Sequence, residues 1–206
     1  MRLNETTRIY FQQHAKAVPG ALSADMARLA DHPEDAAAAA RLSAANPYYN
    51  ALLRTTCVPT MIQGGHAENA LPQHVRVNVN CRLLPDDTAD NVVATLRRVI
   101  ADDQITIALE GRPVPSPLSP LRKDVMAIVT SLTAQTWPTA VVTPIMATGA
   151  TDGKHLRRAG IPVYGVSGMY GDIDDTRAHG RDERIAVDDF YRGVDFMYRF
   201  VKELTK

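Results

Sequence analysis

Apolar and polar residues alternate strictly between positions 75 and 82 of this chain. Valine or cysteine occupies every odd position, and arginine or asparagine occupies every even one. This period of two predicts a strand with one buried face. The β-branched residues of 54–62 predict a second strand, which Pro59 places at a sheet edge or a bulge. A glycine-containing loop separates the two segments, so we expect an antiparallel hairpin that turns around residues 68–70.

A helical pattern follows the hairpin. Thr88 and the acidic residues before it are typical of a helix N-terminus, and apolar residues recur at Val92, Leu96 and Val99. The apolar run at 105–109 then predicts another strand. Strand, strand, helix and strand make up most of an α+β ferredoxin-like unit, which would be incomplete because its opening strand and helix are missing.

The first 50 residues are rich in alanine. We expect helices over residues 21–29 and 33–42, because alanine is the best helix former and Pro33, followed by two acidic residues, suits a first helical turn. The segment 8–11 contains isoleucine, tyrosine and phenylalanine, and it indicates a short strand.

A proline-rich stretch between Gly111 and Pro120 predicts a stiff connection, and we place a domain boundary there, between residues 1–111 and 112–206. The second half predicts the following elements: helix 121–132, strand 141–145, helix 151–159, strand 161–166 and helix 187–204. A βαβ order implies parallel strands. Two strands are too few for a doubly wound sheet, so this half is expected to be an incomplete α/β lobe whose central strands come from elsewhere.

Charge and cysteine content narrow the possible partners. The 23 basic and 23 acidic side chains cancel, which argues against nucleic acid or an anionic membrane as a partner. No apolar run approaches the length of a bilayer span. Cys57 and Cys81 would lie opposite each other in the expected hairpin. Two interpretations stay open: a cross-strand pair, or two buried free thiols, which we favour because unpaired cysteine is commonly buried.

Three places in the second half carry candidate chemistry. His179 stands on a polar loop after the last expected strand, where a neutral imidazole can bind a transition metal or simply be solvated. The turn Gly149–Asp152 lies at a helix start, where backbone N–H groups favour an anion unless a side chain caps them. Ser167 and Gly168 end the next expected strand, at the edge of an α/β sheet where ligands gather.

The hairpin carries a further pair of candidates, Asn69 in its loop and Arg82 thirteen residues later. Strand alternation alone explains an exposed arginine on the polar face of a strand. The alternative interpretation is functional. A guanidinium pairs with a carboxylate through two parallel hydrogen bonds, and an asparagine amide can stabilise a developing oxyanion.

Taken in order, Gly64–Pro72 with Asn80–Arg82, Gly149–Asp152 and Ala178–Arg184 resemble motifs of the zinc-dependent M20 metallopeptidases, in their aminoacylase and glycine-X carboxypeptidase branch. The resemblance covers roughly residues 54–205. It implies part of a lid or dimerisation domain, followed by the end of a catalytic domain. It also implies an enzyme with two zinc ions that cleaves an amide beside a free carboxylate, in N-acyl amino acids or small peptides, and that forms a homodimer or larger oligomer.

The resemblance assigns roles residue by residue. His179 would bind one zinc ion, Arg82 would anchor the substrate carboxylate, and Asn69 would stabilise the tetrahedral oxyanion. Glu183 would hold the His179 loop rather than bind metal. Four further residues would bind substrate: Gly149, Thr151, Ser167 and Gly168.

Other metal donors of that family have no counterpart here, because the sequence contains neither an H-x-D motif nor a Glu-Glu pair. We therefore expect the chain to be the C-terminal portion of such an enzyme, inactive alone and without tight zinc binding. A second interpretation is a non-catalytic dimerisation or interaction module, and a third has another polypeptide supply the missing half. An incomplete lobe is also expected to expose apolar surface.

Overall fold

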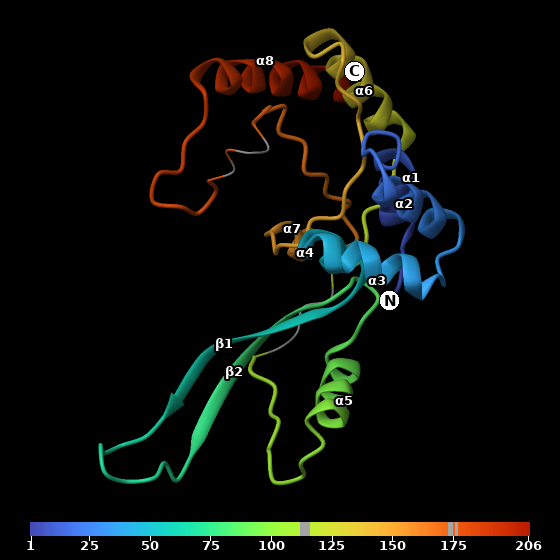
Figure 1. Ribbon diagram of the computed structural model, residues 1–206. Helices are drawn as coiled ribbons and strands as arrows, with labels where there is room; N and C mark the ends of the chain where they lie inside the picture. Colours follow the sequence, from blue (N-terminus) through green and yellow to red (C-terminus); the bar gives the residue numbers. More distant parts are fainter. Residues whose placement is uncertain (112–115, 173–174, 176) are drawn as a thin grey trace. The chain divides into compact units, whose positions relative to one another are not determined.

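The structure is a computed structural model, in which residues 1–111, 116–172, 175 and 177–206 are described (Figure 1). The chain divides into two compact units. Unit one comprises Met1–Leu118 and Pro144–Ile161, and unit two comprises Ser119–Thr143 and Pro162–Lys206. The predicted domain boundary after residue 111 falls next to residues that lie outside the described part of the chain.

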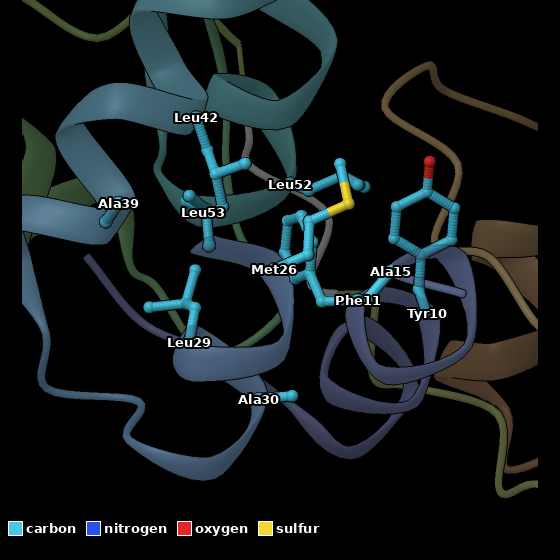
Figure 2. Packing of buried hydrophobic residues seen from close by; sticks show 10 residues of the cluster. All are labelled: Tyr10, Phe11, Ala15, Met26, Leu29, Ala30, Ala39, Leu42, Leu52 and Leu53. Carbon is cyan, nitrogen blue, oxygen red and sulfur yellow. The ribbon is translucent and has the colours of Figure 1, made fainter. Parts of the chain in front are cut away.

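Unit one begins with four helices, α1 (Glu5–His14), α2 (Ala21–Asp31), α3 (Ala36–Ala45) and α4 (Pro47–Leu53). Their inward side chains form one hydrophobic cluster (Figure 2). Its largest fully buried members are Phe11, Met26, Leu29, Leu42, Leu52 and Leu53. The expected helices over 21–29 and 33–42 are confirmed as α2 and α3. The second starts later than expected, because the Asp35 carboxylate caps it by accepting the N–H groups of Ala37 at 3.0 Å and Ala38 at 2.9 Å.

The expected strand at 8–11 is wrong, since these residues lie inside α1. The cause is a capping box. The side-chain oxygen of Asn4 accepts the Thr7 backbone N–H at 2.9 Å, and the Thr7 hydroxyl accepts the Asn4 N–H at 3.0 Å. Once the helix begins, Phe11 is completely buried in the helical cluster, and this burial outweighs the local preference of aromatic residues for strands.

The expected hairpin is confirmed. Strand β1 (Thr56–Gly64) pairs antiparallel with β2 (Val75–Arg82), and a bulge lies between Pro59 and Met61 (Figure 1). Cys57 lies directly opposite Cys81, with their Cα atoms 4.1 Å apart, and the two are joined in a disulfide. The favoured interpretation of two free thiols is therefore wrong, whereas the register that would bring them together is correct.

Helix α5 (Ala89–Ile100) is confirmed, and the Thr88 hydroxyl caps it by accepting the Asn91 N–H at 3.2 Å. The expected strand at 105–109 is not formed. A strand exists only through its hydrogen bonds to a neighbour, and in the described residues β1 and β2 make up the whole sheet. The structure is thus a mixed α+β fold, and the ferredoxin-like arrangement of the lid stays a prediction.

Unit two is built on α6 (Lys123–Thr136) and α8 (Val187–Leu204), which pack on each other. Their core consists of Val125, Leu132, Phe196 and Phe200. The expected strands at 141–145 and 161–166 are absent from the described residues, for the same reason as at 105–109. The short helix α7 (Gly153–Arg158) is present and belongs to unit one.

Apolar side chains remain on the surface of both units. In unit one, Ile62 is 72% exposed and Val75 is 62% exposed; in unit two, Val187 is 68% exposed. Single exposed apolar residues are ordinary, but several on one strand pair or one helix form a face that usually meets another surface. None of the helices in the described residues combines the length and the apolar character that a membrane crossing requires.

Candidate functional site

The β1–β2 ribbon has two chemically different faces, which follow from its register. One face carries Cys57, Pro59 and Ile62 of β1 with the valines and Cys81 of β2, so it is entirely apolar. The other face carries the arginines and asparagines of β2. The bulge between Pro59 and Met61 adds one residue to β1 and so shifts the alternation of its side chains: Ile62, and not Met61, lies opposite Val77 on the apolar face.

Arg82 ends β2 on the polar face, opposite Thr56, and its side chain is exposed. Within the described residues its guanidinium makes no ion pair or hydrogen bond. Arg76, on the same face of the same strand, is paired with the carboxylate of Glu110. The two arginines therefore differ in availability: one is already neutralised, and the other leaves its five N–H donors free for an anion.

Asn69 lies at the other end of the ribbon, in the exposed loop that connects the strands beyond the Gly64–Val75 pair (Figure 1). From Val75 to Arg82 the strand advances seven residue steps, or roughly 23 Å at about 3.3 Å each. The structure thus does not bring Asn69 and Arg82 together within one chain.

The turn at Gly149–Asp152 is followed by α7, and neither Thr151 nor Asp152 caps that helix with its side chain. The helix is instead closed by backbone hydrogen bonds, from the N–H of Lys154 to the Thr151 carbonyl and from that of His155 to the Asp152 carbonyl. Gly149 and Thr151 are exposed. The side-chain cap considered as the alternative to an anion site is therefore not formed.

Ser167 and Gly168 lie in unit two, at the point where the chain meets α8. Gly168 has a φ of +63°, and a Cβ built there would lie 2.5 Å from the Phe196 ring. The Ser167 hydroxyl accepts the Met169 N–H at 3.3 Å. Phe196 is only 2% exposed, so this turn is fixed against a buried aromatic ring, and only glycine fits at 168.

His179 is exposed at a turn closed by the Gly180 N–H, which donates to the Arg177 carbonyl at 2.9 Å. Its φ is +66°, a left-handed conformation that non-glycine residues seldom adopt. A set of ion pairs surrounds the turn. Arg177 pairs with Asp175 and Asp182, and Arg184 pairs with Asp175 at 3.0 Å.

These ion pairs were not foreseen from the sequence. The hydrogen bond from Arg177, supported by that from Arg184, lowers the pKa of the Asp175 carboxyl below its ordinary value, so the carboxylate stays charged as the pH falls. Glu183 was expected to hold the loop, but within the described residues it makes no ion pair. The only sequence signal for the true partners is the density of arginine and aspartate from 172 to 184.

The described residues do not form a metal centre. No three histidine, cysteine, aspartate or glutamate side chains gather within them, so a zinc ion would find fewer than three protein ligands there. Structural and catalytic zinc sites use three or four protein ligands. The residues present therefore do not fit a complete zinc site, and no step through a metal follows from them.

The candidate residues are divided between the two units. Asn69, Arg82, Gly149 and Thr151 belong to unit one, and Ser167, Gly168 and His179 belong to unit two. Each group of candidates has its own local surroundings: the ribbon and the α7 turn in unit one, and in unit two the Gly168 turn against Phe196 of α8 and the His179 turn with its ion pairs.

Comparison with known proteins gives related sequences and a related fold. Residues 14–106 match the M20 peptidase dimerisation domain. The chain is 28% identical over 168 residues to "Probable carboxypeptidase S-like 2" of Dictyostelium discoideum, covering 81% of this chain and 32% of that protein. It is 30% identical over 168 residues to the "N-fatty-acyl-amino acid synthase/hydrolase PM20D1" of Bos taurus, covering 79% of this chain and 33% of that protein.

A crystal structure of the M20 family metallo-carboxypeptidase Sso-CP2 from Sulfolobus solfataricus matches with a TM-score of 0.59 at 16% identity, over 98% of this chain and 45% of that one. At this identity the match concerns the fold alone. The chain spans about a third of the length of the curated relatives that it matches.

Proposed function

Because the chain is a relative of the M20 metallopeptidases and carries their dimerisation domain, we propose that it contributes to a hydrolase that cleaves an amide bond beside a free carboxylate. The substrates proposed are N-acyl amino acids or small peptides. The related proteins are named as carboxypeptidase-like proteins and as an N-fatty-acyl-amino acid synthase/hydrolase, which is the support for this substrate class.

The single observation that carries the proposal is the free guanidinium of Arg82. It is exposed, it ends a strand of the matched domain, and within the described residues no carboxylate neutralises it. We propose that Arg82 binds the substrate carboxylate. Four further residues are proposed as substrate-binding positions: Gly149, Thr151, Ser167 and Gly168. The Asn69 amide is proposed to donate a hydrogen bond to the carbonyl oxygen of the substrate's amide and so to stabilise the oxyanion that develops there. His179 is assigned as one donor of a zinc site whose other donors are not among the described residues.

A binding experiment tests the assignment of Arg82. Hydrogen bonds to charged groups contribute about 1.5–3 kcal/mol, so N-acetylalanine should bind about 10- to 150-fold more tightly than its uncharged amide. Titrations followed by the side-chain NMR signals of the arginines measure both affinities. Arg82→Ala should abolish the difference, whereas Arg76→Ala, which removes an arginine already paired on the same face, should preserve it. Equal affinity for the acid and the amide in the parent chain contradicts the assignment.

A second experiment concerns the metal. The purified 206-residue chain with added zinc should not hydrolyse N-acyl amino acids or dipeptides, because a lone imidazole cannot hold the ion tightly. Isothermal titration should show weak zinc binding that His179→Ala removes and His155→Ala does not. Measurable turnover by this chain would show that the described residues assemble a site from donors that lie apart here.

A second candidate function, a dimerisation module, is favoured by the bare apolar face of the ribbon. Val77 is 46% exposed on that face, directly opposite Ile62 and two residues from Val75 along β2. We propose that this face contributes to association of two copies. Sedimentation equilibrium should give a dimer, and Val77→Asp should weaken it at least tenfold, whereas Asn78→Asp on the opposite face should not. A monomer at high protein concentration contradicts this function.

A further inference from the structure

The β1–β2 ribbon depends on itself for stability. In the described part of the chain no helix packs extensively on either strand, and most of the apolar face is open to solvent. An isolated two-stranded ribbon is marginally stable at best in water. A further interaction must therefore keep the two strands paired, and the Cys57–Cys81 disulfide provides a covalent link between them.

Cys57 and Cys81 join β1 to β2 at the end of the ribbon that is remote from its loop. The cross-link spans 24 residues of chain. On the loop-closure scale, a cross-link of this span shifts the equilibrium between paired and separated strands by roughly 300-fold. Both half-cystines are only half-buried, and the neighbouring Val58 and Val79 are exposed, so a reductant can approach the bond.

Non-covalent contacts hold the chain on the other side of the disulfide. The Thr55 hydroxyl donates to the Asp87 carboxylate at 2.6 Å and accepts the Leu84 N–H at 3.1 Å. Arg2 forms an ion pair with Asp86 at 2.9 Å. These contacts fix the segments that enter and leave the ribbon, and none of them involves a cysteine. Thr56 and Arg82 lie between this anchor and the disulfide.

We propose that the Cys57–Cys81 disulfide is a reducible switch that controls the order of the outer ribbon, residues 58–64 and 75–80, and of the Asn69 loop, while leaving the Arg82 end in place. With the bond intact, the loop is carried at the end of an ordered ribbon. With the bond reduced, the outer strands separate, and Asn69 loses its defined position. The proposal rests on the disulfide, the register and the anchor contacts within one copy of the chain, and it does not depend on the substrate roles proposed for Asn69 and Arg82.

The chemistry is ordinary thiol–disulfide exchange with a dithiol. One thiolate of the dithiol attacks a sulfur of the Cys57–Cys81 bond and forms a mixed disulfide, which releases the other cysteine as a thiolate. The second thiolate of the dithiol then displaces the remaining cysteine and closes the reductant into its own disulfide. Two electrons pass from the dithiol to the cysteine pair, and the two protons of the dithiol end on Cys57 and Cys81.

Hydrogen–deuterium exchange on the whole chain, before and after treatment with dithiothreitol, tests the switch. Backbone amides of 58–64 and 75–80 should exchange at least tenfold faster after reduction. The Leu84 amide, which Thr55 holds, and the amides of α2 and α3 should be unchanged. The double variant Cys57→Ser with Cys81→Ser should exchange like the reduced chain and should not respond to dithiothreitol.

Three results would overturn the proposal. The first is unchanged exchange in the ribbon after complete reduction, measured by thiol titration. The second is faster exchange throughout unit one, which would make the bond a general staple rather than a local switch. The third is two free thiols in the chain purified without reductant. Helical circular dichroism of the serine variant distinguishes a local change from a failure to fold. The Arg82 binding assay reads the proposed function separately, because the switch leaves that end of the ribbon in place.

Discussion

Replacing Gly168 with alanine should destabilise unit two by about 2–5 kcal/mol. Two costs add. The residue has a φ of +63°, and a left-handed backbone costs a residue with a Cβ about 1–2 kcal/mol. The new methyl would also lie 2.5 Å from Cδ1, 2.6 Å from Cγ and 2.7 Å from Cβ of Phe196. Forcing extra volume into a packed site costs about 1–3 kcal/mol, and this ring is buried and cannot turn away.

Urea denaturation followed by the fluorescence of Trp137 is the appropriate assay. It is the chain's single tryptophan, and its ring lies 5.7 Å from that of Phe196, so its emission reports on this core. Gly165→Ala is the matched control in the same unit, because a Cβ there meets nothing within 4 Å. It should change the free energy of unfolding by no more than about 0.5 kcal/mol.

The steric part of the cost can be separated from the backbone part. In a Phe196→Leu background, the penalty of Gly168→Ala should shrink, because two residues in contact do not contribute additively. If Gly168→Ala unfolds at the same urea concentration as Gly165→Ala, the close approach of residue 168 to Phe196 is wrong. The position of Ser167 beside that turn would then be wrong with it.

Three further predictions concern the helical cluster of α1–α4. Asn4→Ala should cost about 1 kcal/mol in urea denaturation followed by circular dichroism, because it removes the capping oxygen from the Thr7 N–H of α1. Leu42→Ala should lower the free energy of unfolding by about 2–5 kcal/mol in the same assay, since the side chain is fully buried. A change in the slope of the urea transition with no shift in its midpoint would refute a rigid core. Acid should destabilise the cluster, because hydrogen bonds from the Ala38 N–H and Arg28 lower the pKa of Asp35 from 3.8 to about 2, and a hydrogen bond from Arg41 lowers the pKa of Asp25. The stabilising contribution of these carboxylates is present above pH 3.8 and is lost as the pH falls toward 2. A midpoint of acid unfolding that Asp35→Asn leaves unchanged would contradict this.

The elements that could be predicted from sequence are those whose signals are local. The strict alternation of 75–82 gave β2, and the register that places Cys57 opposite Cys81 followed from a single loop between two strands. Helix α5 was predictable because Thr88 caps it and its apolar residues repeat at helical spacing. Helix α5 is specified within a few residues of itself, and β2 meets its partner β1 across a single loop, so neither needs a partner far away in the sequence.

The elements that could not be predicted depend on distant partners. The segments 105–109, 141–145 and 161–166 have strand composition, but a strand forms only where another strand offers a matching row of N–H and C=O groups. At 8–11 the opposite happened, since a capping box and a helical core imposed a helix on strand-favouring residues. The ion pairs around His179 belong to the same class: Asp175 and Arg184 are nine residues apart, and only the fold brings them together.

The separation of Asn69 from Arg82 links the two candidate functions. In an N-acyl amino acid the carboxylate and the amide carbonyl are only a few bonds apart, whereas the two side chains lie at opposite ends of a ribbon of roughly 23 Å. An arginine or asparagine side chain bridges only a fraction of that length. A ligand held by Arg82 is therefore out of reach of Asn69 in the same chain, and both can contact one substrate only if a second ribbon approaches it. If Arg82 and Asn69 have the roles proposed above, association of two copies and binding of the carboxylate are parts of one function. Val77→Asp, chosen to weaken the dimer, should then remove any contribution of Asn69 while leaving that of Arg82 intact.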